Sequence, residues 1–313
     1  MTTPADNDHL TWASAPWTPI PGPNTAPIGW HKHLPYLAPT RGGTALHTLD
    51  IWLPSLLTTT STLPSGPGTW LIYIHGGAWR DPAVTAASFT AAASRLLQRA
   101  ATAAAGPTPL AGIASLNYRL SPHPGHPAPG DPARAAAHPD HIADVLAGLA
   151  FLQRAGAARG RYVLVGHSCG ATLALQAVMH PRRWGVEAEV GKPAVVVGFN
   201  GLYDLAGFIR APPEGWEGLV GPYEEFIRGA FGPEEAVWRA VCPATAEGVV
   251  LVQSREDTLV PSSQLESMRV YLEGWVGEVR TEVVEVEDAG DHDDMWGRGD
   301  KMAEVLWDVL LGV

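Results

Sequence analysis

The chain has few of the features that mark nucleic-acid-binding or disulfide-rich proteins. Its 313 residues carry 21 Lys and Arg against 32 Asp and Glu, a formal net charge of −11, and no basic run. Phosphate binding depends on clustered Lys and Arg, so nucleic acid is not expected as a partner. A basic patch for a membrane surface is equally missing. Two cysteines, Cys169 and Cys242, are too few for a disulfide framework.

Long hydrophobic segments are lacking as well. No stretch approaches 18 uninterrupted apolar residues, which argues against a transmembrane helix. The first residues show neither the basic n-region nor the apolar h-region of a secretory signal. We therefore expect a cytoplasmic protein with no membrane partner. Its 46% hydrophobic and 17% charged residues fit a globular chain that buries a sizeable core.

Short apolar runs alternate with helical patterns along most of the chain. Strands are predicted at 49–54, 70–74, 110–118, 161–166, 194–200, 248–254 and 281–288, and helices at 84–105, from about 139, at 169–179, 262–274 and 300–312. This alternation implies right-handed crossovers. The predicted fold class is α/β, with a mainly parallel central sheet flanked by helices.

The domain organisation follows from where this rhythm is absent. Residues 1–45 are rich in Pro, Gly and Thr and predict an irregular arm, and 46–313 form a single domain. Gly, Pro and Trp interrupt the pattern at 201–245, which predicts a small cap insertion over the carboxyl edge of the sheet. Exposed Trp side chains in this segment would permit a homodimer.

A serine nucleophile is predicted within "GHSCG", residues 166–170. The pattern G-x-S-x-G occurs by chance about 0.1 times in a chain of this length. Here it follows the apolar strand "YVLV" and opens a helix, as a nucleophile elbow does. The helix N-terminus favours negative charge at Ser168. The alternative is an ordinary strand–helix turn with an idle serine.

A nucleophilic serine needs a base, and the base needs an orienting carboxylate. His292 follows the last predicted strand, whereas His180, the only other histidine after Ser168, ends the helix behind the serine. Asp257 and Glu256 follow the preceding strand, and Asp257 is preferred because "D-x-x-V-P" leads from a strand into a helix. The neighbours of the histidine remain competitors for the imidazole: Asp291, Asp293 and Asp294.

The stretch "HGGAW", residues 75–79, predicts an oxyanion hole. It lies after the strand 70–74 and before a helix, and glycine leaves backbone N–H groups open to a ligand. The expected donors are Gly76, Gly77 and, after the nucleophile, Cys169. His75 and Trp79 are candidates for the substrate pocket, although Trp79 could equally pack beneath the loop.

No metal or other cofactor is expected. Four histidines, His123, His126, His138 and His141, cluster in sequence, but no carboxylate or cysteine stands at ligand spacing. Cys169 is expected to be a small packed residue rather than a redox thiol, and Cys242 to be buried and inert.

These motifs resemble those of the α/β-hydrolase superfamily over roughly residues 45–313. "HGGAW" with "GHSCGATL", "NYRLSP", "HPDHIADV" and "DHDDMW" is similar to the kynurenine formamidase (arylformamidase) family, in which H-G-G-x-W replaces the H-G-G-G of hormone-sensitive-lipase-type esterases. The resemblance implies hydrolysis of N-formyl-L-kynurenine to L-kynurenine and formate in tryptophan catabolism, by Ser168, Asp257 and His292. A short-chain carboxylesterase would share every catalytic residue, and a non-catalytic ligand-binding protein is the third alternative.

Overall fold

A computed structural model describes residues 18–20, 28–54, 63, 68–102, 108–157, 161–179, 181–187, 190–238, 248–274 and 280–313. Several predicted features lie outside these residues: most of the arm before residue 28, the end of the cap after Trp238, and the residues His180 and Cys242. Among the described residues, none of the helices combines the length and the apolar character that crossing a bilayer requires.

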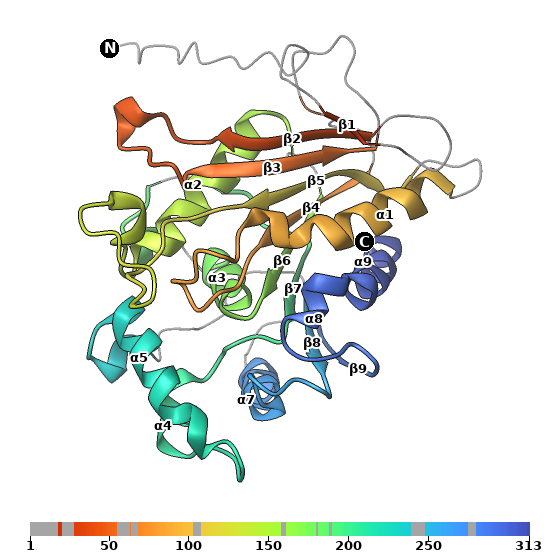
Figure 1. The fold of residues 1–313 in the computed structure, drawn as a ribbon. Coiled ribbons are helices and arrows are strands. Elements are labelled where there is room, and N and C mark those ends of the chain that lie inside the picture. Colours follow the sequence, from red (N-terminus) through yellow and green to blue (C-terminus); the bar gives the residue numbers. More distant parts are fainter. Residues whose placement is uncertain are drawn as a thin grey trace.

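The described strands form one sheet in the order β1-β2-β3-β5-β4-β6-β7-β8-β9 (Figure 1). From β5 to β9 all neighbouring strands are parallel, whereas the pairs β1–β2, β2–β3 and β3–β5 are antiparallel. The predicted mainly parallel sheet is confirmed. The strands are β1 Thr18–Ile20, β2 Ile28–Pro35, β3 Thr48–Leu53, β4 Thr69–Ile74, β5 Leu110–Leu116, β6 Tyr162–His167, β7 Val195–Phe199, β8 Gly248–Ser254 and β9 Arg280–Val286.

The prediction of an irregular arm at 1–45 is wrong for residues 18–20 and 28–35, which form strands β1 and β2. β2 is eight residues long and pairs along β3. Its register shifts between His31 and Leu34, and His33 between them has φ 53°. A bulge of this kind inserts an extra residue and breaks the two-residue period by which a strand is identified in sequence.

The central strands are apolar without interruption because both faces of the sheet are covered. In β4, Trp70, Ile72 and Ile74 belong to one buried cluster, and Leu71 and Tyr73 belong to the other. Successive side chains of a strand point to opposite faces, so a strand between two helical layers buries all of them.

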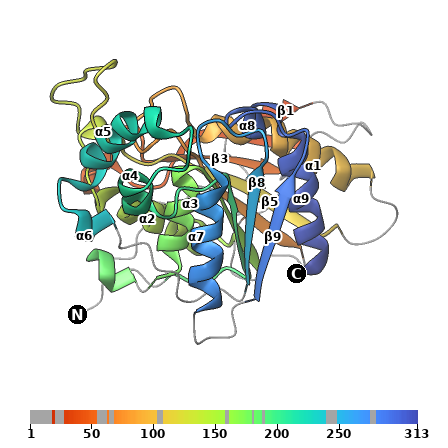
Figure 2. The same ribbon diagram turned by 90° about the horizontal axis from the view of Figure 1, so that it is seen from below.

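Helices α2 (Asp140–Arg154), α3 (Cys169–Ala177) and α7 (Ser262–Glu273) cover one face, and α1 (Thr90–Thr102), α8 (Asp294–Arg298) and α9 (Asp300–Gly312) cover the other. Figure 2 shows α3 and α7 on one side of the sheet and α1 and α9 on the opposite side. The predicted helices are confirmed within a few residues, with α1 preceded by a 3-10 turn at Ala86–Phe89.

Among the residues described between β7 and β8, the segment predicted as a cap contains the α-helices α4 (Leu205–Arg210), α5 (Val220–Phe231) and α6 (Glu235–Trp238). Figure 2 shows them grouped on the same side of the sheet as α2 and α3. Asp204 caps α4 by accepting the amide of Gly207 at 2.8 Å.

Candidate active site

Ser168 lies on the sharp turn between β6 and α3. Its φ of 54° and ψ of −124° are unusual for a residue with a side chain, and such strain clusters at functional sites. The flanking glycines allow the turn. A Cβ on Gly166 would lie 2.2 Å from the carbonyl oxygen of Gly170, and a Cβ on Gly170 would lie 2.2 Å from that of Ile74. Any larger residue at either position would push the turn apart.

His292 and Asp257 lie on the loops that follow β9 and β8, at the same carboxyl edge of the sheet as Ser168. His292 Nδ1 is 2.8 Å from Asp257 Oδ2, and both residues are largely buried, 5% and 7% exposed. The other oxygen, Oδ1, accepts the amides of Leu259 and Val260 at 2.8 Å each. A carboxylate held in this way accepts the Nδ1 proton and leaves Nε2 of the imidazole as the basic nitrogen.

The other carboxylates near the imidazole accept hydrogen bonds from different donors. Glu256 Oε2 accepts the amide of Gly290 at 2.5 Å. Asp291 Oδ1 accepts the amide and hydroxyl of Thr258 at 2.9 and 2.8 Å, and these bonds lower the pKa of the Asp291 carboxyl. Asp293 Oδ1 accepts the indole N–H of Trp296, and Asp294 Oδ2 accepts the backbone amide of Asp291. Of the carboxylates that the sequence left open, the structure therefore brings Asp257 to the ring.

His167, which the sequence analysis did not single out, connects the elbow to the histidine loop. Its Nε2–H donates to the carbonyl oxygen of His292 at 3.1 Å, and the two rings lie 4.6 Å apart. Burial, followed by the charge of His292, lowers the pKa of His167 well below 6.5. His167 is consequently a neutral donor that fixes the backbone of His292. A polar residue directly before the serine was the only sequence signal for it.

The loop after β4 approaches the nucleophile closely. A Cβ on Gly76 would lie 3.0 Å from Ser168 Cβ, and Gly77, Ala78 and Trp79 have φ of 91°, 49° and 60°. Three consecutive residues in the left-handed region turn the chain sharply. Among the described residues, the amides of Gly76 and Gly77 have no acceptor within the protein. Cys169 begins α3, so its amide is among those a helix leaves without an intrahelical acceptor.

The two side chains predicted for the substrate pocket are buried. His75 is 2% exposed, donates from Nδ1 to the Gly76 carbonyl at 2.9 Å and stacks on Tyr118 at 4.4 Å. Burial lowers the pKa of His75 to about 4, so its ring is neutral. Trp79 has no exposed surface and packs edge-on against Phe231. For Trp79 this geometry favours packing beneath the loop, the second of the two alternatives.

Helix α5 contacts the loops on both sides of Ser168. Phe226 and Phe231 lie 6.1 and 4.8 Å from the Trp79 ring, and Arg80 Nη1 is 3.0 Å from Glu225 Oε1. On the other side, the Tyr223 hydroxyl donates to the Leu259 carbonyl at 2.8 Å, beside Asp257. Sequence patterns of the 201–245 segment could not reveal these contacts, which depend on how the insertion folds back.

A groove of about 420 Å³ lies elsewhere, at the amino-terminal ends of β8 and β9 beside α9. Arg280, Glu282 and Asp308 line it, and none of the predicted site residues does. Open α/β sheets bind ligands at the carboxyl ends of their strands, so the groove is not assigned to the chemistry. Within the part of the chain that the structure describes, no group of three or more His, Cys, Asp or Glu side chains could hold a metal ion.

Comparisons with known proteins agree with this architecture. A search of protein-family models found no match. Solved structures similar to the chain include esterase B from Lactobacillus rhamnosis, with a TM-score of 0.63 and 15% identity over 90% of this chain and 86% of that one. An HSL homologue from a metagenome library has a TM-score of 0.58 and 16% identity over 94% of this chain and 88% of that one. At these identities the likeness establishes the α/β-hydrolase fold.

Sequence relatives are much more similar. A kynurenine formamidase-like hydrolase of Fusarium equiseti is 37% identical over 298 residues, 87% of this chain and 92% of the relative. A kynurenine formamidase of Aspergillus versicolor is 35% identical over 84% of this chain and 94% of the relative. A kynurenine formamidase of Meyerozyma guilliermondii is 31% identical over 67% of this chain and 73% of the relative. Identity of this extent confirms the resemblance of the motifs. The chain belongs to the kynurenine formamidase family of α/β-hydrolases.

Proposed function

We propose that this hydrolase deformylates N-formyl-L-kynurenine to L-kynurenine and formate, with Ser168, Asp257 and His292 as its catalytic triad. The observation that carries the proposal is the 2.8 Å contact of His292 with Asp257, at the same edge of the sheet as the strained turn of Ser168, whose neighbour His167 donates to the His292 carbonyl. The substrate is inferred from the family, since the relatives from Aspergillus versicolor and Meyerozyma guilliermondii are named kynurenine formamidases.

The reaction begins with attack of Ser168 Oγ on the formyl carbon, while His292 Nε2 takes the serine proton. The carbonyl oxygen becomes an oxyanion, which the amides of Gly76, Gly77 and Cys169 stabilise. One such donor is worth about 3–4 kcal/mol in other hydrolases. No cofactor takes part in this scheme.

Collapse of the tetrahedral intermediate breaks the bond between the formyl carbon and the aryl nitrogen. The imidazolium of His292, held by Asp257, donates its Nε2 proton to the departing arylamine. Water, deprotonated by the same imidazole, then attacks the formyl ester of Ser168 and releases formate.

The cytoplasmic location and the homodimer remain predictions from the sequence.

The test compares kcat/KM on N-formyl-L-kynurenine and on 4-nitrophenyl acetate, with formate measured as product. Ser168→Ala is expected to abolish both activities. Ser94→Ala serves as the matched control, because the Ser94 hydroxyl donates to a carbonyl within α1, away from the site.

Each alternative has its own outcome. Ester hydrolysis with negligible turnover of the formamide would replace the proposal by a short-chain carboxylesterase. Hydrolysis of neither substrate, with no organophosphate adduct on Ser168, would make the chain a ligand-binding protein instead.

A further inference from the structure

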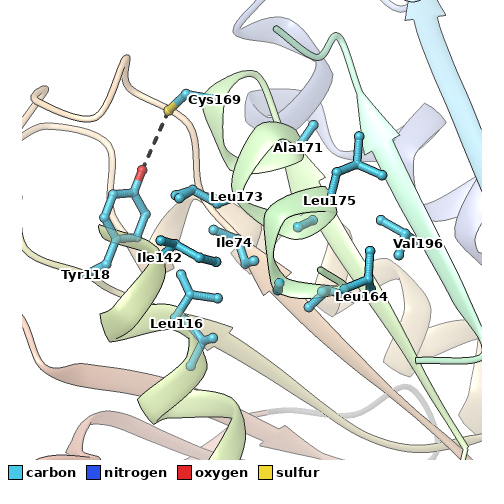
Figure 3. Packing of buried hydrophobic residues seen from close by; sticks show 14 of the residues in the cluster. Ile74, Leu116, Tyr118, Ile142, Leu164, Cys169, Ala171, Leu173, Leu175 and Val196 are labelled. Atoms are coloured by element: carbon cyan, nitrogen blue, oxygen red, sulfur yellow. Dashed lines mark hydrogen bonds between the residues drawn. The ribbon is translucent and has the colours of Figure 1, made fainter. Parts of the chain in front are cut away.

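The side chain of Cys169 occupies the space between the nucleophile turn and the HGGAW loop. It is fully buried, and Sγ accepts the backbone amide of Trp79 at 3.2 Å. Figure 3 shows the thiol pointing toward the hydroxyl of Tyr118, 3.6 Å away. The residue after the serine thus contacts the loop through its side chain in addition to the amide assigned above.

The protons around this sulfur can be placed. Burial raises the pKa of Cys169 to about 11, so the group is a neutral thiol near pH 7. The Tyr118 hydroxyl has one proton, which points to the carbonyls of His75 and Gly76 at 3.0 and 3.2 Å. The S–H therefore donates to the Tyr118 oxygen, while a sulfur lone pair accepts the Trp79 amide.

The loop needs such support because its backbone is unusual. Ala78 and Trp79 are residues with side chains in the left-handed region, which persists only where surrounding contacts impose it. Cys169 Sγ accepts the amide of Trp79 at one end of the HGGAW loop, and the Tyr118 hydroxyl donates to the carbonyl of His75 at the other end. The amides of Gly76 and Gly77 lie between these two points.

We propose that the Cys169 side chain is a positioning residue, which sets the distance between the oxyanion-binding amides of the HGGAW loop and Ser168. The inference rests on the proposed function, because it assumes that these amides stabilise the reacting oxygen. Interactions made only in the transition state affect kcat rather than KM. Misplacement by about 1 Å costs about 100-fold in rate.

The test uses Cys169→Ala, which deletes the sulfur, and Cys169→Ser, which keeps a group able to accept the Trp79 amide and to donate to Tyr118. Leu175→Val is the matched control. It removes packing from the same helix, and Figure 3 shows Leu175 on the side of Leu164 and Val196, away from Tyr118. Each variant is assayed on the formamide and on 4-nitrophenyl acetate, with thermal unfolding and the affinity for phenylboronic acid, whose serine adduct mimics the tetrahedral intermediate.

For Cys169→Ala we expect kcat to fall at least about tenfold on the substrate the wild type hydrolyses, with KM within about twofold. Boronate affinity should fall in parallel, and Cys169→Ser should recover most of both. Unchanged kcat in Cys169→Ala, equal losses in the Ala and Ser variants, or the same loss in Leu175→Val would each overturn the inference. An inactive wild type on both substrates would instead refute the proposed function.

Discussion

Replacing Asp257 by asparagine exchanges one carboxylate oxygen for an NH2 group, and the backbone decides which one. Oδ1 accepts the amides of Leu259 and Val260, whereas Oδ2 faces His292 Nδ1. With the amide nitrogen at the Oδ1 position, two backbone N–H groups would lose their acceptor, at about 1–3 kcal/mol each. The substituted side chain is therefore expected to keep its oxygen there and to point its NH2 group at His292.

An NH2 group facing Nδ1 can only donate, so the imidazole moves its proton to Nε2. It then lacks the lone pair that takes the Ser168 proton. The same exchange in the serine-protease triad lowers kcat about 10⁴-fold, equivalent to about 5.5 kcal/mol. We expect a loss of that order in kcat for Asp257→Asn, with KM little changed.

The assay is steady-state hydrolysis of N-formyl-L-kynurenine, with thermal unfolding to verify the fold. Glu256→Gln is the matched control, because the Glu256 carboxylate accepts the Gly290 amide rather than a proton of the imidazole. Its kcat should stay within about fivefold of the wild type, since only a loop contact changes. Activity of Asp257→Asn above a tenth of the wild type, or an equal loss in Glu256→Gln, would refute the reasoning.

Three further substitutions test other parts of the structure. Gly76→Ala places a Cβ 3.0 Å from that of the serine, so kcat should fall about 100-fold, whereas Gly218→Ala, with nothing within 4 Å, should leave it unchanged. Burial lowers the pKa of His141 from 6.5 to about 4. The folded protein holds this ring neutral, so its free energy of unfolding should decrease as the pH falls from 6.5 to about 4. In urea titrations across this pH range, His141→Gln should remove about 3 kcal/mol of the pH-dependent loss of unfolding free energy; a pH dependence equal to that of the wild type would contradict this. Trp79→Gly should lower the free energy of unfolding by about 3–5 kcal/mol without improving hydrolysis of longer-chain esters, and a clear gain on them would restore Trp79 as a pocket wall.

Much of the fold could be predicted because its pattern is local. The runs at 70–74 and 162–165 are apolar on consecutive residues, as expected of a strand covered on both faces. β2 escaped prediction because the bulge at His31–Leu34 hides its alternation. The order of "HGGAW" and "GHSCG" along the chain was equally visible, since each is a short contiguous motif next to a strand.

The partners of each site residue were less accessible to sequence. The sequence offered five carboxylates as partners of the His292 imidazole. Which of them contacts the ring depends on hydrogen bonds that join the loops after β8 and β9. No sequence pattern indicated that the side chain of His167 contacts His292 or that the side chain of Cys169 contacts Trp79. Such contacts join residues about 90 or more positions apart, so no local periodicity encodes them.

The sequence by itself determined the α/β class, the nucleophile turn and the glycine loop, because backbone conformation and strand burial are set by neighbouring residues. Only the tertiary structure decided that Asp257 faces His292, that Trp79 is buried against α5, and that a thiol joins the serine turn to the glycine loop. These distances arise from the packing of separate loops on one sheet edge. Packing specifies positions to fractions of an ångström, which the pattern of residue types does not contain.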